Sequence, residues 1–506
     1  MGFLTEQEIA ELVPSELLPH ATPIPTQIVS SDEYTPPPQS EKQKEVEARL
    51  LAMGDELGRK QGLSRRAFFQ TAAGMAAGFV ALNDTFGPVF DVSRAEAATP
   101  AMAQERANTF KDQFIMDMHT HFLRDDTRLE NFVRSREAVG KAGWNPALVD
   151  RPQTLEDLKF NNYFKEVYLD SDTKVALISS SPSEIPRDWF LTNEMMIEAR
   201  DRVNREAGAR RMFAHAIFTP GWDGWLDHLE GSLERKPESI KGYTVGDNTN
   251  KDEAKHPWLM DDENITYKAY ELCVKHGIKN VCVHKGLFPA ATAKRWPHLL
   301  KYAMVDDVGK AAKDWPQLNF VIYHGGYRHA AGGKAEDGWN EFEQTGRISW
   351  VTDLAEVPEK YGVTNVYADV GQLFAQSVVA EPRLGAALMG IMGKGLGYDR
   401  VWGTDAVWTG SPQWQIEALR RLEIPEDMQK KYGFKPVGPA NGPIKEAIFG
   451  LTNAKLYDFD PKKRTDIGPN RDRFARMKEE YEKNGPARSN LRYGYVPGPV
   501  DWSAFA

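Results

Sequence analysis

From residue 112 onward, the sequence alternates short apolar runs with longer stretches of helical character. The runs are 114–118, 175–178, 212–217, 240–245, 280–283, 320–323, 365–368 and 400–403. The stretches between them, such as ITYKAYELCVKHG, usually end near a Gly, Pro or Asn, as helices do. This alternation predicts a parallel sheet with helical crossovers. Eight strands over about 350 residues favour an α/β fold of the (β/α)8 TIM-barrel type with insertions.

Polar residues follow four of these eight runs. The first run ends in His119 and His121, the fifth in His284, the sixth in His324 and the eighth in Asp405. Residues two apart on a strand point to the same side, so both imidazoles of the first run face one point. In such barrels the carboxyl ends of the strands carry the active site. Imidazole and carboxylate are ligands that suit zinc and neighbouring divalent metals, so the sequence predicts a metal site there.

Each of these signals also has an ordinary structural explanation. A histidine that ends a strand is usually a buried, hydrogen-bonded residue, and an aspartate after a strand is often a helix cap. The prediction depends on the coincidence of four strand ends that each offer a ligand or a base.

The motifs DMHTHF, VHKG, YHGG and GTDAVW resemble the amidohydrolase superfamily. They are most similar to the amidohydrolase-related branch, which includes aminocarboxymuconate-semialdehyde decarboxylase and resorcylate-type decarboxylases. The resemblance covers about residues 112–460, and the sequence NAKLY at 453–457 resembles the last helix of that branch.

The resemblance implies a single divalent metal ion, usually zinc, with manganese and iron as alternatives. Its implied ligands are His119, His121, His284 and Asp405, and His324 is the implied catalytic histidine. A bound metal lowers the pKa of a water towards neutrality, and Asp405 can then take a proton from that water. His324 would polarise the substrate oxygen or stabilise developing negative charge.

A second metal would require a bridging ligand. Binuclear relatives use a carboxylated lysine at the end of the fourth strand. Here Thr244 stands where related sequences often place that lysine, and Lys241 falls earlier in the run. A single metal is therefore favoured, and a surface lysine at the start of the strand is the plainer interpretation of Lys241.

The expected activity is hydrolysis of a small organic ester, lactone or amide. The alternative is non-oxidative decarboxylation of an aromatic or unsaturated acid at the same site, and a catalytically inactive binding barrel is a third interpretation. Arg124, Arg187 and Arg328 follow strands, where a guanidinium can bind a substrate carboxylate, and Arg124 and Arg328 are the candidates for this role. For each of them, a solvated loop arginine is the more common interpretation. Asp369 is expected to orient a ligand imidazole or to cap a helix, and His215 to lie inside the barrel.

Composition excludes other classes of protein. The net charge of −9 argues against nucleic acid as a partner, because binding phosphates needs clustered Lys and Arg. Only two cysteines occur, which rules out a disulfide framework and a cysteine-based zinc site. The expected partner is a small-molecule substrate. The oligomeric state is left open by the sequence; barrels of this branch often pair, so a homodimer is one state that the resemblance allows.

The first 97 residues are expected to lie outside the barrel. Residues 22–47 are rich in Pro, Ser, Thr and charge and predict disorder. Residues 64–70, SRRAFFQ, then precede a short apolar run and the small-x-small sequence at 95–97. This order resembles a bacterial twin-arginine signal and implies the translocation machinery as a partner. The mature protein is then expected to begin near Ala98 and to be periplasmic or secreted, whereas the alternative is an amphipathic helix with a chance Arg-Arg pair.

The sequence therefore divides into three parts. Residues 1–97 hold the disordered region and the signal, 112–460 the barrel, and 461–506 a polar tail expected to wrap the surface.

Overall fold

A curved, fully parallel sheet forms the centre of the computed structural model, which describes residues 22–28, 34, 36–141, 153–397 and 401–485. Its seven strands are hydrogen-bonded in the order in which they occur along the chain. They are β1 (Met116–His121), β2 (Val175–Ser179), β3 (Met212–Ile217), β4 (Ser239–Tyr243), β5 (Asn280–His284), β6 (Asn319–Tyr323) and β7 (Val366–Ala368).

The segment 401–406 closes this sheet into a barrel. On one side, the amide of Val401 donates to the carbonyl of Ala368 at the end of β7, at 3.0 Å. On the other side, the amide of Met118 in β1 donates to the carbonyl of Trp402, at 2.9 Å. The segment thus takes the position of the predicted eighth strand, although residue 400 lies outside the described residues. The prediction of a TIM-type barrel is confirmed.

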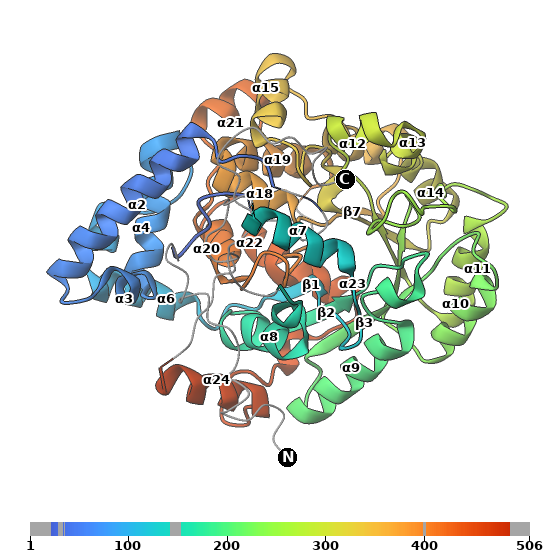
Figure 1. Cartoon of the computed structure of the whole chain (residues 1–506), viewed down its shortest axis with the longest axis horizontal. Helices are drawn as coiled ribbons and strands as arrows, with labels where there is room; N and C mark the ends of the chain where they lie inside the picture. The colour runs from blue at the N-terminus through green and yellow to red at the C-terminus, as the bar shows by residue number, and fades with distance from the viewer. Residues whose placement is uncertain (1–21, 29–33, 35, 142–152, 398–400, 486–506) are drawn as a thin grey trace.

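Helices surround the barrel, as Figure 1 shows. Those that follow the successive strands are α7 (Glu130–Lys141), α8 (Phe160–Phe164), α9 (Asn193–Ala207), α10 (Trp225–Glu234), α11 (Thr266–His276), α12 (Ala290–Arg295), α13 (Leu300–Ala303), α14 (Val308–Asp314), α15 (Ala335–Thr345), α16 (Val351–Ala355), α17 (Val357–Tyr361), α18 (Leu373–Ala380), α19 (Pro382–Gly395), α20 (Gln413–Arg421) and α21 (Glu426–Tyr432). The chain then forms α22 (Pro443–Glu446) and α23 (Thr452–Leu456), and the tail adds α24 (Arg473–Lys483).

Alternate residues of the strands fill the barrel interior. A single apolar cluster takes members from six of the strands, including Met118, Leu177, Phe213, Cys282 and Tyr323. Their neighbours in sequence pack outward against the helices, which is why these strands have continuous apolar runs instead of an alternating pattern. Residues of α23 belong to the same interior cluster. The barrel is therefore a packed core, and polar chemistry is confined to its ends.

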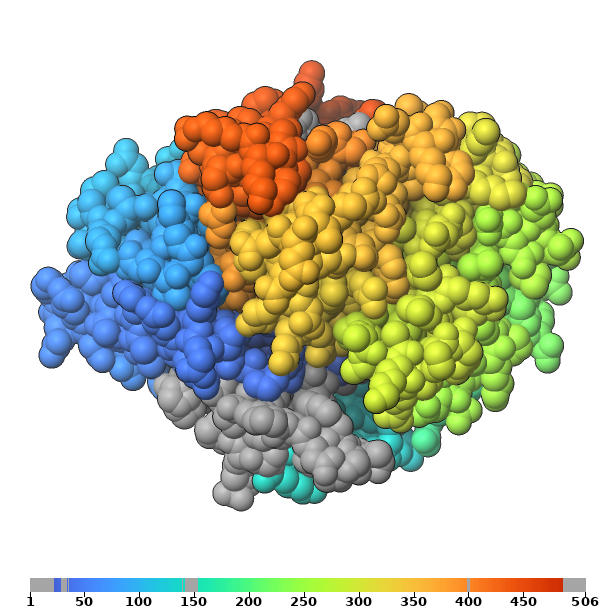
Figure 2. Space-filling model, turned by 90° about the horizontal axis from the view of Figure 1, so that it is seen from above, coloured from blue at the N-terminus to red at the C-terminus, as the bar shows by residue number. Residues whose placement is uncertain are grey.

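The N-terminal region differs from the expectation of disorder. It folds into α2 (Glu41–Lys60), α3 (Arg65–Phe69), α4 (Ala72–Phe86), α5 (Arg94–Ala98) and α6 (Pro100–Phe110). Figure 1 shows these helices as a layer on one side of the barrel, and Figure 2 shows the same segment in blue against the barrel. Even Ile24, within the stretch expected to be disordered, is fully buried and contacts α4 at Gly78. This stretch lacks a core of its own but packs on neighbouring helices.

The tail follows the surface as expected over its described part. The carboxylate of Asp472 caps α24 and binds the buried guanidinium of Arg211 at 2.6 and 2.9 Å. Phe474 packs edge-on against Phe164, with ring centroids 4.7 Å apart. Residues 486–506 lie outside the described part of the chain. Among the helices that the structure describes, none combines the length and apolar character needed to cross a bilayer.

Candidate metal centre

Two imidazoles and one carboxylate converge at the carboxyl ends of the strands. The Nε2 atom of His119 lies 3.0 Å from Oδ1 of Asp405, and the Nε2 atom of His121 lies 3.1 Å from the same oxygen. All three side chains are buried. Residues 284 positions apart in the sequence thus meet at one oxygen atom, as the pattern of strand ends predicts.

The backbone of β1 and of the segment 401–406 holds this arrangement. The amide of Asp405 donates to the carbonyl of His119 at 2.8 Å. Below it, Oδ1 of Asp117 accepts from the amides of His119 and Thr404, both at 3.1 Å. Burial raises the pKa of the Asp117 carboxyl to about 7, although these hydrogen bonds act to lower it. The register between β1 and β2 also shifts between Asp117 and Thr120, and this irregularity lies directly at the histidine pair.

His324 belongs to the same cluster, and His284 lies beside it. Ligand atoms of His119, His324 and Asp405 all lie within 4.8 Å of one another. The rings of His284 and His324 are 4.6 Å apart, and His284 stacks on Tyr243 at 4.8 Å. Among the described residues, the compact group thus contains His324, to which the resemblance assigned a catalytic role alone, and not His284, which it assigned as a ligand. The division of roles between the two stays a prediction.

Partners on the far side of each ring fix the imidazole orientations. Nδ1 of His119 binds Oδ2 of Asp369 at 2.9 Å, Nδ1 of His121 faces the carbonyl of Ser179 at 3.1 Å, and Nδ1 of His324 faces the carbonyl of Gly371 at 3.0 Å. Since a carbonyl oxygen only accepts, Nδ1 of His121 and of His324 must carry the proton. Their Nε2 atoms then present a lone pair to the cluster.

Charge and burial set the protonation of the cluster. Burial lowers the pKa of His121 to about 3 and of His324 to about 4, so both are neutral near pH 7. Burial also lowers the pKa of His119, but the Asp405 and Asp369 carboxylates outweigh it, and the net shift is upward. Burial raises the pKa of Asp405, yet the neighbouring His119 holds it well below its usual range. Asp405 is therefore ionised beside the neutral imidazoles of His121 and His324.

Lys241 is a barrel-interior residue, and its interpretation as a surface lysine was wrong. The side chain is fully buried, its Nζ lies 3.4 Å from Nε2 of His119, and it sits 4.0 Å above the ring of Tyr323. Gly242 faces outward against Phe218 and Trp258, so the neighbouring Lys241 points inward. Thr244, by contrast, donates to backbone carbonyls of His284 and Tyr302.

The remaining predicted residues occupy different positions. His215 lies inside the barrel as predicted, between the hydroxyls of Tyr323 and Ser239. Arg124 is bound by both carboxylate oxygens of Asp126, at 2.5 and 2.6 Å. The guanidinium of Arg328 lies 4.9 Å above the ring of Trp350, and its Nε has no hydrogen-bond partner among the described residues.

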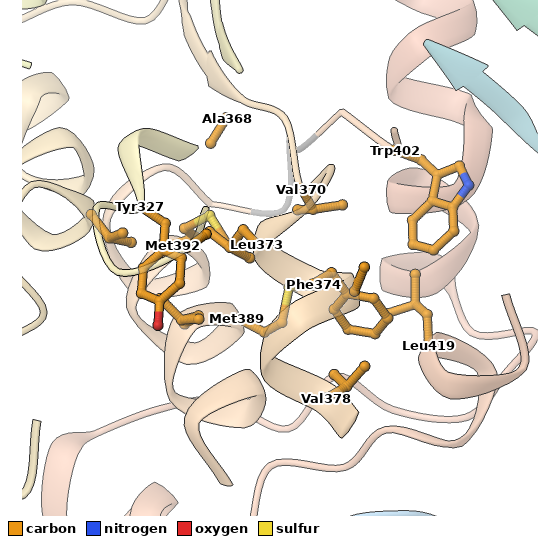
Figure 3. Packing of buried hydrophobic residues seen from close by; sticks show 14 of the residues in the cluster. Tyr327, Ala368, Val370, Leu373, Phe374, Val378, Met389, Met392, Trp402 and Leu419 are labelled. Atoms are coloured by element: carbon orange, nitrogen blue, oxygen red, sulfur yellow. The ribbon is translucent and has the colours of Figure 1, made fainter. Parts of the chain in front are cut away.

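Apolar packing anchors the loop that supports His119 and His324. This loop, 369–372, leads directly into α18, whose eight residues are all buried. Figure 3 shows Leu373, Phe374 and Val378 of this helix among large apolar side chains; the rings of Phe374 and Trp402 are 5.9 Å apart. An apolar helix buried on every side is a rigid support for the polar loop before it.

Fold and site together define a (β/α)8 barrel with a buried cluster of histidine and aspartate at its carboxyl-terminal face. No family model and no curated protein matches the chain. Solved structures with some similarity include a candidate 2-pyrone-4,6-dicarboxylic acid hydrolase from Pseudomonas putida, 13% identical with a TM-score of 0.38, covering 69% of this chain and 98% of that one. An amidohydrolase II is 14% identical with a TM-score of 0.36, covering 68% and 99%. Amidohydrolase 2 from Bifidobacterium longum subsp. infantis is 12% identical with a TM-score of 0.32, covering 69% and 100%. Similarities of this size do not establish a family, so the functional argument depends on the site.

Proposed function

We propose that the protein is a metal-dependent hydrolase that cleaves a small organic ester, lactone or amide. One observation carries the proposal. Nε2 of His121, whose proton is on Nδ1, faces the ionised Oδ1 of Asp405 at 3.1 Å. Two lone-pair acceptors at this separation repel each other unless a cation neutralises them.

A divalent metal fits this donor set. Zinc binds imidazole nitrogen and carboxylate oxygen at about 2.0–2.2 Å. The separations of His119 and His121 from Asp405, 3.0 and 3.1 Å, bring these ligand atoms close enough to share one such cation. His284 and His324 supply further nitrogen donors from β5 and from the end of β6. When bound, such a metal acts as a Lewis acid on a carbonyl and lowers the pKa of water.

The protein's own groups supply the remaining steps. Asp405 is ionised and accepts the proton of the attacking water. His324, with its proton held by the carbonyl of Gly371, has a lone pair on Nε2 and therefore acts as a ligand or a proton acceptor, not as a hydrogen-bond donor to substrate. Burial of the cluster excludes bulk water and strengthens each charge interaction.

We propose Arg328 and Arg124 as the groups that bind an anionic part of the substrate. Both follow strands that carry cluster residues, so they lie at the same end of the barrel. Arg328 is the stronger candidate, because its buried Nε has no partner among the described residues while Arg124 is already paired with Asp126.

Metal analysis and a substrate panel test the proposal. Freshly purified protein should contain about one divalent metal per chain, and it should hydrolyse members of a panel of esters, lactones and amides. His324→Ala and Asp405→Asn should abolish that activity, whereas His298→Ala, at an exposed histidine, should leave it unchanged.

Other outcomes would contradict the proposal. Release of CO2 from carboxylic acids without any hydrolysis would favour the decarboxylase. Full activity in metal-free protein would overturn the metal requirement. The Lys241 ammonium would then be the cation that neutralises the cluster. Unchanged activity in both site variants would favour a binding barrel.

A further inference from the structure

The segment that resembles an export signal is packed into the folded protein. Helix α4, the apolar run of that signal, has ten buried residues, including Phe79, Leu82 and Phe86. Its glycines are sites of close approach: a Cβ atom on Gly74 would lie 2.2 Å from the carbonyl oxygen of Phe68. A helix that is apolar on all sides belongs in a core, and its small residues let neighbouring segments come close.

The small-x-small sequence at 95–97, the expected cleavage site, is helical, and its last two residues are buried. It lies within α5, and Ala97 is fully buried. Both carboxylate oxygens of Glu96 bind the guanidinium of Arg421 on the barrel helix α20, at 2.6 and 3.1 Å. Glu96 and Arg421 are themselves buried, with 6% and 2% of their surface exposed. Proteases cut exposed and flexible chain. This segment is helical and is held by the buried Glu96 and Ala97, so it is a poor substrate in the folded state.

Backbone hydrogen bonds join the same segment to the barrel. Phe90 forms an antiparallel bridge with Leu422 at the end of α20. The amide of Asp91 donates to the carbonyl of Arg421 at 2.7 Å, and the amide of Glu423 donates to the carbonyl of Val89 at 2.8 Å. Such bonds do not depend on side-chain identity, and they fix the position of the segment on both sides of the bridge.

A second attachment lies at α2. Lys42 lies 3.6 Å from the carboxylate of Glu381, a buried residue directly before α19. The side chain of Gln376 in α18 donates to the hydroxyl of Tyr34 and also to Oε1 of Gln372, in the loop that supports His324. The N-terminal region thus contacts α18 and the start of α19, which follow the loop 369–372, as well as α20.

From these contacts we infer that residues 36–110 are a permanent helical layer of the mature protein and that the chain is not cut after Ala97. Removal of the segment would leave the Arg421 guanidinium without Glu96 and would expose the apolar residues of α20 that the segment now covers. The inference is independent of the proposed hydrolase activity.

Intact mass measurement tests the inference directly. The full chain, with a C-terminal tag, is produced in a bacterial host with an active twin-arginine system, and each cell fraction is analysed. We expect a soluble species that retains the residues before Ala98. A soluble, folded species beginning near Ala98 would overturn the inference.

A substitution tests whether the layer is docked in solution. Glu96→Gln in the full chain should lower the melting temperature by about 2–5 °C, because it removes the carboxylate that binds both terminal nitrogens of the buried Arg421 guanidinium and leaves only Glu417, among the described residues, as its ion-pair partner. Glu56→Gln is the matched control, since Glu56 is an exposed carboxylate of α2 paired with Lys60, and it should have no effect. Equal melting temperatures for Glu96→Gln and the unsubstituted chain would overturn the inference.

Amide hydrogen exchange in the unsubstituted protein tests the same docking if the Glu96→Gln variant does not fold. In the unsubstituted protein, amides of α4 and α5 should be protected to the same degree as those of α20, because they belong to one core. Exchange of α4 and α5 at the rate of an unfolded chain would contradict docking.

Discussion

Asp369 acts on the cluster through His119. Its Oδ2 accepts from Nδ1 of His119 at 2.9 Å and from the amides of His324 and Gly371 at 3.2 and 3.1 Å. One carboxylate oxygen therefore orients a proposed ligand and holds the loop beside it. Such partners behind a metal ligand fix the imidazole tautomer and increase its basicity.

Asp369→Asn should lower metal affinity by about 10–100-fold, because the amide removes the negative charge behind His119. Titration of metal into the chelator-treated protein measures the change. Asp353→Asn, at a half-exposed carboxylate of α16, is the control and should bind metal normally. Equal affinities for Asp369→Asn and the unsubstituted protein would show that His119 is not a ligand or does not need this partner.

Glu381 should make stability depend on pH. Burial raises its pKa to about 7 from an ordinary value of 4.5, despite the nearby Lys42. A carboxyl whose folded-state pKa is raised contributes stability below its unfolded pKa, and that stability is lost as the pH rises to the folded value. Relative to the unsubstituted protein, Glu381→Gln should therefore gain about 3 kcal/mol in the free energy of unfolding between pH 4 and pH 8. Denaturant unfolding at the two pH values measures the gain, and a constant difference between the two proteins would contradict the raised pKa.

At the level of single residues, the sequence predicted which groups converge but not all of their neighbours. His119, His121 and Asp405 were predictable because period-two alternation and strand ends depend on local pattern alone. The inward position of Lys241 depends on where β4 begins, and Gly242 made that strand the least certain. His324 was also predicted, because it follows the sixth run, and it lies within 4.8 Å of His119 and Asp405. The left-handed backbone at His324, with φ of 60°, was not indicated by any local pattern.

Among the structural elements, the strands followed the predicted runs closely. β3 has the predicted bounds, 212–217, and β2 and β5 extend the predicted runs by one residue each. Apolar runs that are buried on both faces give a strong signal in a parallel sheet. The helices at 41–110 were not predicted because their sequences are short, rich in small residues or highly charged. Their stability comes from packing against one another and the barrel, which the sequence of each segment does not reveal.

The loop between β7 and α18 is the element most sensitive to added volume. A Cβ atom on Gly371 would lie 2.7 Å from Nδ1 of His119 and 3.0 Å from Oδ2 of Asp369. Gly371→Ala should therefore displace the imidazole and reduce kcat/KM by roughly 100-fold, measured on the best substrate of the panel. Gly231→Ala in α10 is the matched control: a Cβ there meets nothing within 4 Å, and activity should be unchanged. Normal activity in Gly371→Ala would show that the position of His119 does not matter for catalysis.

On the scale of the whole molecule, the proposed metal would join parts of the chain that are far apart in sequence. His119 and His121 belong to β1, His324 follows β6, and Asp405 lies in the segment that closes the barrel. Without a cation, Nε2 of His121 and Oδ1 of Asp405 repel each other at 3.1 Å, at the point where the sheet closes. Metal binding should therefore stabilise the closed barrel and not the site alone.

Metal removal should lower the stability of the entire protein. A ligand at 100 times its Kd stabilises the folded state by about 2.7 kcal/mol, which corresponds to about 2–3 °C in melting temperature for a chain of this size. Treatment with a chelator should produce a decrease of this order together with loss of hydrolysis, and added zinc or manganese should restore both. Asp405→Asn provides the control, because a chain without this carboxylate should melt at the same temperature with and without chelator. If the chelator left the melting temperature and activity of the unsubstituted protein unchanged, the cluster would have to be neutralised by protons and by the Lys241 ammonium instead of a metal.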